Sequence, residues 1–284
     1  MFFSQKEREL SDKNRNFASM KTVTKHTTNY GNWLSNKKLI INGCVLFLCL
    51  CSTVLGALFK THWLFIALFS ALSAVALVVF VYKMLHHRML SYTGGGLMGR
   101  IHQYVLDHLS WDGQGRFLDV GCGSGALTIL CAKTFPESDC TGIDNWDSKW
   151  EFTKGMCEQN ATIEGVGARC HFVTDDASRI DYTNDSFDAV VSNLVYFHVT
   201  ENPDKESLLN ETLRVLKPGG HFALLDHFCQ ESIYGDINII IKHLKEAGIA
   251  EIHFVPNVEK EIPIPGWMLL NGKLAKLGIL YGKK

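Results

Sequence analysis

One stretch of the sequence combines a carboxylate with glycines at a spacing that suits a nucleotide-like ligand. Asp119 lies within the short apolar run 117–120, and Gly121, Gly123 and Gly125 follow at alternate positions. An apolar run, glycines and then a segment without helix breakers predict a strand, a tight turn and a helix. Glycines permit positive φ and close approach of a ligand, and the N–H groups of a helix N-terminus face the same point. The sequence therefore predicts a ligand-binding turn here.

The spacing of this turn differs from the usual dinucleotide-binding fingerprint. Asp119 stands where that fingerprint normally has an apolar residue, and Gly125 comes one residue too early for G-x-G-x-x-G. A carboxylate buried at the end of a strand is costly unless it meets donors or a cationic ligand. A membrane-bound nicotinamide-dependent oxidoreductase is therefore disfavoured and stays an alternative interpretation.

Several motifs occur in an order that resembles the class I S-adenosylmethionine-dependent methyltransferases. The resembling runs are Leu-Asp-Val-Gly-Cys-Gly-Ser-Gly at 118–125 and Leu-Arg-Val-Leu-Lys-Pro-Gly-Gly at 213–220, and the resemblance extends from about 94 to 272. It implies an α/β fold with a doubly wound, mostly parallel seven-stranded sheet. It also implies S-adenosylmethionine as the cofactor and no metal, with cofactor contacts from Asp119, Gly121, Cys122, Gly123, Gly125, Asp144, Asn145, Asp176, Ala177 and Asn193.

The residues after the second predicted strand suit the ribose and adenine of such a cofactor. Asp144 follows the apolar run 140–143 about 20 residues after the turn, where an acid can accept from both ribose hydroxyls. A solvated loop carboxylate is the alternative. The family usually has an apolar residue next, which covers the adenine. Asn145 departs from that pattern, so Trp146 is the alternative cover.

An acidic pair follows the third predicted strand, 170–174. Asp176 and Ala177 match the family's Asp-Ala pair, which implies contacts with the adenine amino group and ring edge. Asp175 duplicates the acid, but the alignment of Ala177 favours Asp176.

Candidate acceptor-side residues follow the fourth predicted strand, 186–193. In some amine methyltransferases this position reads Asn or Asp, two prolines, then Tyr or Phe. Asn193 and Tyr196 match the first and last residues of this motif, but Leu and Val stand where the motif has prolines. The resemblance therefore does not imply that the acceptor atom is nitrogen. His198 is the candidate base, because imidazole ionises near neutrality, and a structural histidine is the alternative.

Two uncharged apolar runs precede the resembling region, at 39–59 and 63–82. Each has about 20 residues, which spans the hydrocarbon core of a bilayer as a helix. The pair predicts a transmembrane hairpin, because a buried helical pair in a soluble protein would normally keep a polar face. Basic residues flank both outer ends, which places the N-terminus and the catalytic domain in the cytoplasm.

The sequence thus divides into a polar basic arm at 1–38, mobile or lying on a surface, and the hairpin at 39–82. A connector with a lid-like helix follows at 83–110, and a methyltransferase domain fills 111–284. The last segment, 274–281, is predicted to be an amphipathic tail that touches the bilayer. A net charge of -1 gives no general attraction to nucleic acid, and nine cysteines without zinc spacing indicate free thiols of a reducing compartment.

These features predict a membrane-anchored S-adenosylmethionine-dependent methyltransferase, with the lipid bilayer as one partner. The short tether favours a small lipophilic or membrane-associated acceptor over a soluble metabolite. A catalytically silent adaptor that keeps the cofactor fold is the remaining alternative, since methyl transfer requires no obligatory catalytic residue.

Overall fold

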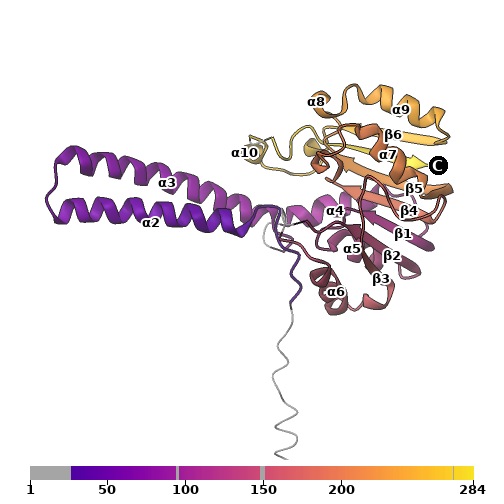
Figure 1. Ribbon diagram of the computed structural model, residues 1–284, viewed down its shortest axis with the longest axis horizontal. Helices are drawn as coiled ribbons and strands as arrows, with labels where there is room; N and C mark the ends of the chain where they lie inside the picture. Colours follow the sequence, from indigo (N-terminus) through magenta and orange to yellow (C-terminus); the bar gives the residue numbers. More distant parts are fainter. Residues whose placement is uncertain (1–26, 94–95, 148–150, 271) are drawn as a thin grey trace, which may run out of the picture.

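A pair of long helices projects from an α/β domain in the computed structural model, which describes residues 27–93, 96–147, 151–270 and 272–284 (Figure 1). The projecting helices are α2 (Asn36–Leu58) and α3 (Trp63–Leu90). The helices of the domain are α4 (Leu97–Asp107), α5 (Ala126–Thr134), α6 (Lys154–Ile163), α7 (Lys205–Arg214), α8 (Glu231–Tyr234), α9 (Ile237–Glu246) and α10 (Gly266–Leu269), with short turns η1 (Gly167–Arg169), η2 (Tyr196–His198) and η3 (Val258–Lys260). The strands are β1 (Gly115–Val120), β2 (Ser138–Asp144), β3 (Cys170–Thr174), β4 (Phe187–Asn193), β5 (Leu216–Asp226), β6 (Glu251–Pro256) and β7 (Gly278–Lys283).

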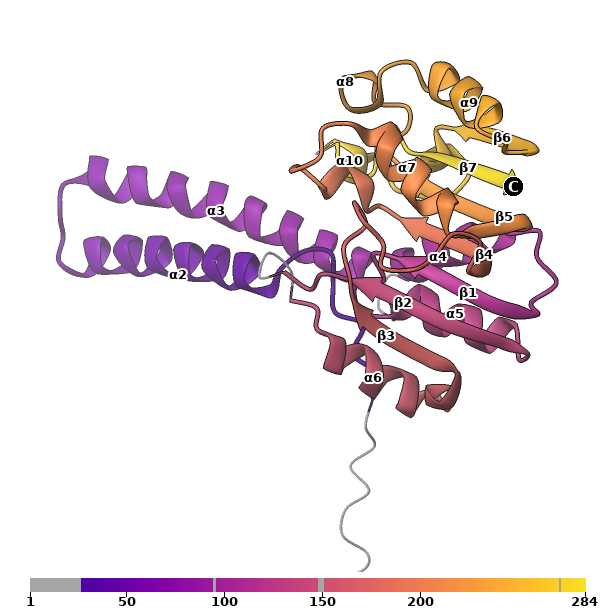
Figure 2. The same cartoon turned by 45° about the vertical axis from the view of Figure 1, so that its right-hand side comes forward.

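The seven strands of the described residues form one sheet in the order β3-β2-β1-β4-β5-β7-β6. β1 pairs in parallel with β2 and β4, whereas β7 runs antiparallel between β5 and β6. Neighbouring residues of β1 pack on opposite faces of the sheet. Phe117 lies in the hydrophobic cluster that includes α4, α5 and α6, and Leu118 lies in the cluster that includes α7 and α9. Helices therefore cover both faces (Figure 2), and the doubly wound, mostly parallel prediction is confirmed.

The two apolar helices pack side by side as a hairpin and are longer than the sequence predicted. Both are long and apolar enough to cross a membrane. In each helix, only 6% of the most apolar stretch of 18 residues is buried within the described structure. α3 continues to Leu90, well past the predicted end at residue 82, because nothing between Tyr82 and Leu90 breaks a helix. The predicted connector 83–110 therefore begins inside α3.

The described part of the predicted N-terminal arm packs against the domain. We call residues 27–35 the strap; residues 1–26 of that arm lie outside the described residues. Asn29 exchanges two hydrogen bonds with the buried Asn160 side chain of α6, at 2.8 and 2.9 Å. The Tyr30 ring is buried and contacts the Tyr92 ring at 4.4 Å between centroids. The strap thus fixes the entry to α2 against the domain.

The predicted amphipathic tail at 274–281 is wrong. β7 begins at Gly278 and takes up the second half of this segment, and it lies between β5 and β6. Leu277, Ile279 and Leu280 are fully buried. The physical reason is pairing on both edges: a strand inside a sheet is covered on both faces, so its short apolar run belongs to the core and not to a membrane surface.

The hairpin base lies at the carboxyl edge of the sheet (Figure 1). Gly121 and Asn193 are found at this edge, where the parallel strands β1 and β4 end. α3 also contacts the C-terminal part of the domain, since Tyr82 Oη donates to the Trp267 carbonyl of α10 at 3.5 Å. The strap and α10 hold the hairpin from two sides, so the ends of the strands face the base of the hairpin.

Candidate cofactor-binding and acceptor site

The predicted turn joins β1 to α5 and is shaped by glycines with left-handed backbone. Gly121 has φ +74° and Gly123 has φ +56°. A Cβ on Gly121 would lie 2.2 Å from Val195 Cγ2, so only glycine lets the loop after β4 approach the turn. The N–H groups of Gly121 and Cys122 both donate to the Ile143 carbonyl at the end of β2, at 2.8 and 2.9 Å. These two hydrogen bonds fix the turn to the end of β2, and the loop after β4 packs closely against it.

Asp119 is the buried carboxylate beneath this turn, with 1% of its surface exposed. The Thr128 hydroxyl of α5 donates to Asp119 Oδ2 at 2.7 Å. Burial raises the pKa of the Asp119 carboxyl to about 7, and the bond from Thr128 opposes this only in part. The Asp119 carboxyl is therefore readily protonated in the protein without ligand, and a cationic group bound beside it would favour the charged form.

Asp144 braces the turn from the end of β2. Its two oxygens accept from Gly123 N at 2.9 Å and from Trp146 N at 2.8 Å. Each carboxylate oxygen can accept twice, so both can still accept from a ligand hydroxyl. Burial raises the pKa of Asp144, although the two backbone donors act in the opposite direction.

The structure distinguishes Asn145 from Trp146. The Trp146 indole lies over the turn, because its Nε1 donates to the Gly123 carbonyl at 2.8 Å. Asn145 is exposed and its Oδ1 accepts from Asp147 N at 3.2 Å. The indole is therefore the better placed of the two to cover an adenine.

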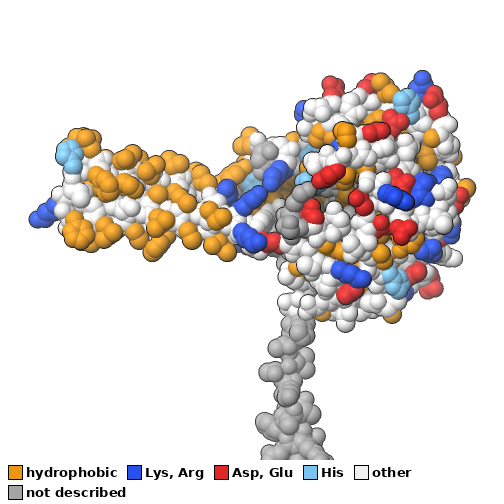
Figure 3. Space-filling model, in the orientation of Figure 1, with side chains coloured by type: hydrophobic (Ala, Val, Ile, Leu, Met, Phe, Trp, Pro, Cys, Tyr) orange, Lys and Arg blue, Asp and Glu red, His pale blue; other side chains and the backbone are white. Residues whose placement is uncertain are grey.

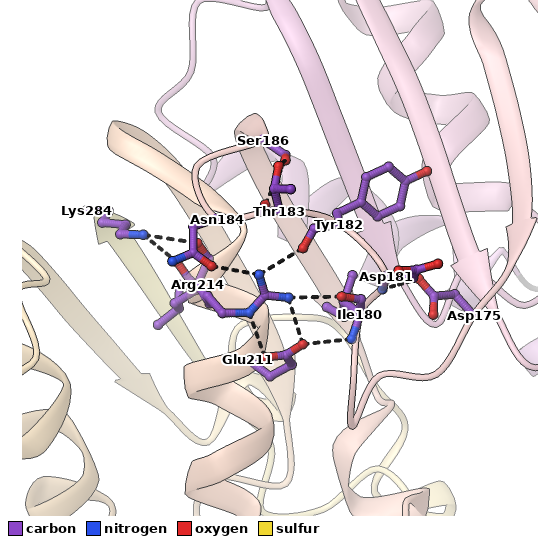
Figure 4. A network of polar contacts seen from close by, with 11 residues as sticks. Asp175, Ile180, Asp181, Tyr182, Thr183, Asn184, Ser186, Glu211, Arg214 and Lys284 are labelled. Carbon is purple, nitrogen blue, oxygen red and sulfur yellow. Dashed lines mark hydrogen bonds and ion pairs between the residues drawn. The ribbon is translucent and has the colours of Figure 1, made fainter.

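The duplicated acids after β3 have different surroundings. Asp175 accepts from the N–H groups of Asp176 and Asp181 and so braces its loop. The segment beyond it is held by Arg214 of α7, which donates to the carbonyls of Ile180 and Tyr182 (Figure 4).

Asp176 is exposed and accepts from Ser178 N at 2.7 Å. Ala177, the second member of the pair, is half-buried beside it. Asp176 is more exposed than Asp175, so its carboxylate is open to solvent, and its contact with adenine stays a prediction.

Cys122 contributes packing to the turn. Its side chain is buried against β2, where a Cβ on Gly142 would lie 3.0 Å from Cys122 Sγ. Burial raises the pKa of this thiol well above its usual value, so it stays protonated. The buried Cys122 side chain therefore packs against β2 and not toward solvent.

The three predicted acceptor-side residues have different positions. Tyr196 is fully buried and its hydroxyl bonds Thr212 Oγ1 of α7 at 3.0 Å, in the core between the sheet and α7. The predicted catalytic role of Tyr196 is therefore wrong, because its hydroxyl lies in the core and bonds α7. His198 is exposed, with its ring 3.7 Å from that of Phe197. Asn193 ends β4 beside the glycine turn.

Three buried side-chain atoms lack a hydrogen-bond partner within the described part of the chain and come from elements near the carboxyl edge: His102 Nδ1, Asn193 Oδ1 and His227 Nε2. A buried polar atom without a partner costs about 1–3 kcal/mol, so such atoms indicate where a ligand or water binds. Sequence reasoning found Asn193 but missed His102 and His227. Their only signal is a histidine in an apolar setting, which is far commoner as a core residue.

The described residues contain no group of three or more His, Cys, Asp or Glu side chains that could hold a metal ion. The site instead consists of a glycine turn, carboxylates after two strands and an unpartnered amide oxygen. Together with the sheet order, these features define a class I S-adenosylmethionine-dependent methyltransferase fold.

The comparisons with known proteins agree. Residues 117–220 match a family model described as a methyltransferase domain, so this part of the chain is a methyltransferase domain. It is 30% identical over 178 residues to cycloartenol-C-24-methyltransferase of Arabidopsis thaliana, covering 55% of this chain and 50% of that protein. It is 29% identical over 127 residues to the ubiquinone/menaquinone biosynthesis C-methyltransferase UbiE of Desulfotalea psychrophila, covering 45% and 47%.

Among solved structures, geranyl diphosphate methyltransferase in complex with S-adenosylmethionine has a TM-score of 0.50 at 13% identity, covering 70% of this chain and 94% of that one. This likeness concerns the fold alone. The chain spans about half the length of the two curated relatives named above.

We expect Asp144→Ala to weaken S-adenosylmethionine binding roughly ten- to a hundredfold, because a lost hydrogen bond to a charged group costs about 1.5–3 kcal/mol. Calorimetric titration measures the effect. Asp139→Ala is the matched control, since Asp139 lies exposed near the other end of β2 and bonds His171. Unchanged affinity of the Asp144 variant would remove Asp144 from the site.

Proposed function

We propose that this protein is a membrane-anchored methyltransferase that transfers the methyl group of S-adenosylmethionine to a small lipophilic acceptor at the bilayer surface. One observation carries the proposal: the carboxyl ends of the parallel strands face the base of the apolar hairpin, which the strap and α10 hold from two sides (Figure 1). Ligands of open α/β sheets bind outside the carboxyl ends of the strands. A cofactor bound there would lie close to the membrane surface.

The residues present fit S-adenosylmethionine. The glycine turn leaves room beside its backbone, and Asp144 is placed at the end of β2 for the ribose hydroxyls. Asn193 Oδ1, which is buried and has no partner among the described residues, suits the ammonium group of the cofactor. The bound cofactor supplies an electrophilic methyl group, and the protein supplies orientation and excludes water.

Positive charge at the hairpin base supports a position beside lipid headgroups. Lys38 of α2, Lys83 of α3 and Lys273 of the segment after α10 lie near one another. Burial lowers the pKa of Lys273, and the charges of the other two lysines lower it further. Figure 3 shows Lys and Arg side chains gathered where the apolar hairpin meets the domain. Clustered lysines beside an apolar helix favour an anionic membrane surface.

The relatives support a lipophilic acceptor. The names of the curated relatives refer to cycloartenol and to ubiquinone and menaquinone biosynthesis. An enzyme acting on a water-soluble acceptor would not need an apolar hairpin beside the carboxyl edge of the sheet. Both points support a lipid-soluble acceptor.

Labelled methyl groups test this function. Cells that produce the full-length protein, the Asp144→Ala variant or neither are fed methionine with a deuterated methyl group, and lipid and aqueous extracts are compared by mass spectrometry. We expect a labelled species in the lipid extract that depends on the unaltered protein. Protein-dependent label confined to the aqueous extract would contradict the lipophilic acceptor, and tighter binding of a nicotinamide dinucleotide than of S-adenosylmethionine would contradict the methyltransferase assignment.

We further expect the hairpin tip and the domain to lie on opposite sides of the membrane. Thr61→Cys at the tip and Thr200→Cys on the domain are both at exposed positions. An impermeant thiol reagent added to intact cells should label the Thr61 variant above the background of the unaltered protein and leave the Thr200 variant at background. The reverse pattern would invert the topology, and release of the protein by alkaline carbonate would contradict insertion.

A further inference from the structure

His227 follows β5 directly and lies near Asn193 at the carboxyl edge of the sheet. β4 and β5 are adjacent, with Asn193 opposite Leu225, and Leu194 N donates to the Leu225 carbonyl at 2.8 Å. His227 is 3% exposed. It therefore occupies the side of the sheet where an acceptor molecule would meet the cofactor.

One hydrogen bond fixes the tautomer of the His227 ring. Nδ1 lies 3.0 Å from the Ala275 carbonyl oxygen. A carbonyl can only accept, so Nδ1 carries the hydrogen and donates it. In the neutral ring, Nε2 is then the nitrogen with a free lone pair, and it has no partner within the described residues. The neutral ring is thus oriented so that Nε2 can accept a hydrogen bond from a ligand.

The surroundings favour a neutral hydroxyl as that donor. The Phe197 ring packs 4.4 Å from the His227 ring between centroids and provides an apolar neighbour. The adjacent carboxylate, Asp226, is already occupied, since it accepts from the N–H groups of Tyr196 at 2.9 Å and His227 at 2.6 Å. With this carboxylate engaged, a substrate ammonium group would be poorly compensated here.

We propose that His227 Nε2 accepts the proton of a substrate hydroxyl during methyl transfer, so that the acceptor is a lipophilic alcohol or phenol. This inference rests on the proposed function. The O–H bond breaks and its proton goes to Nε2, while an oxygen lone pair forms the O–CH₃ bond. The bond between the methyl carbon and sulfur breaks, its electron pair returns to sulfur, and S-adenosylhomocysteine and the methyl ether leave. The imidazolium then releases its proton to solvent.

The first test follows the ring itself in the full-length protein. The protein, labelled with ¹⁵N-histidine, is placed in detergent micelles with S-adenosylhomocysteine and observed by NMR, and its His227 signals are assigned by their loss in His227→Asn. We expect the Nδ1–H tautomer and a shift of the Nε2 signal on adding para-dodecylphenol. Dodecylbenzene, which lacks only the hydroxyl, should leave that signal unchanged. An Nε2–H tautomer, or the same response to both compounds, would overturn the proposal.

The second test separates proton transfer from structure. In His227→Asn the amide nitrogen can replace Nδ1 as donor to Ala275, but nothing replaces Nε2. We expect unchanged cofactor affinity and melting temperature and about a 10²- to 10⁴-fold loss of kcat toward para-dodecylphenol, the usual range for a lost general base. His171→Asn, at an exposed position on β3, is the matched control and should keep full activity.

The pH profile completes the second test. The unaltered enzyme should lose activity as the medium becomes acidic, and the Asn variant should lack this dependence. The ionisable groups around His227 include Asp226, His198, Lys205, Cys229, Tyr234 and Lys276. Asp226 interacts electrostatically with His227, so the loss of kcat in the variant is read together with the pH profile. Methylation of dodecylamine but not of the phenol, or a His227 variant with near-normal kcat, would overturn the inference. Failure of the unaltered protein to bind S-adenosylmethionine would instead overturn the proposed function.

Discussion

The free energy of unfolding of the protein without cofactor should fall as the pH rises from about 4 to 7, and Asp119 should be a main cause. Burial raises the pKa of Asp119 from 3.8 to about 7, so the folded state binds a proton that the unfolded state has already released in this range. A raised folded-state pKa gives a stability contribution that is complete below the unfolded pKa and is lost as the pH rises through the folded pKa. At about 1.4 kcal/mol per pKa unit, the full effect is about 4 kcal/mol.

Denaturant unfolding of Asp119→Asn at several pH values isolates this contribution. The Asn side chain keeps an oxygen that can accept from the Thr128 hydroxyl but cannot titrate. Burial also raises the pKa of Asp144 and of Asp226, so some pH dependence should remain in the variant. The slope should be clearly shallower than in the unaltered protein. Equal slopes would mean that Asp119 is ionised in the folded protein throughout this range.

The parts of the fold that the sequence predicted depend on local signals. β3 (Cys170–Thr174) has the predicted bounds, because an apolar run determines it. α5 (Ala126–Thr134) follows the glycine turn as predicted, because its segment contains no helix breaker. The same is true of the turn between β1 and α5, where alternating glycines leave few other conformations. Sequence patterns of this kind require no knowledge of distant residues.

The parts that could not be predicted depend on contacts between distant residues. Asn29 of the strap forms a hydrogen bond with Asn160, 131 positions away in the sequence. Single polar residues of this kind produce no periodic pattern that could have predicted the contact. β7 lies in the sheet because two other strands pair with it, although its sequence resembles an amphipathic tail.

The acceptor side shows the same limit. Tyr196 stands at the family's aromatic position, yet its hydroxyl meets Thr212 on a helix that follows later in the chain. His227 becomes a candidate only when folding brings the Ala275 carbonyl to its ring. A motif therefore locates the cofactor turn well, whereas the residues that meet the acceptor are determined by tertiary packing.

Gly121→Ala should have the largest effect of any single methyl group added at the turn. At φ +74° an alanine adopts the left-handed region, which costs about 1–2 kcal/mol. Its Cβ would also lie 2.2 Å from Val195 Cγ2, and overpacking of this kind costs typically 1–3 kcal/mol. We expect a loss of roughly 2–5 kcal/mol in the free energy of unfolding and loss of measurable cofactor binding, because the loop after β4 must move away from the turn.

The double variant Gly121→Ala, Val195→Ala separates the two costs. Removing the Val195 methyl groups relieves the contact but leaves the backbone strain, so stability should recover by about 1–3 kcal/mol. Cofactor affinity should recover only in part, since the strained turn still displaces its N–H groups. Gly155→Ala is the matched control, because nothing lies within 4 Å of the Cβ added there and alanine favours the helix α6. A double variant no more stable than Gly121→Ala alone would show that the contact with Val195 does not set the requirement for glycine.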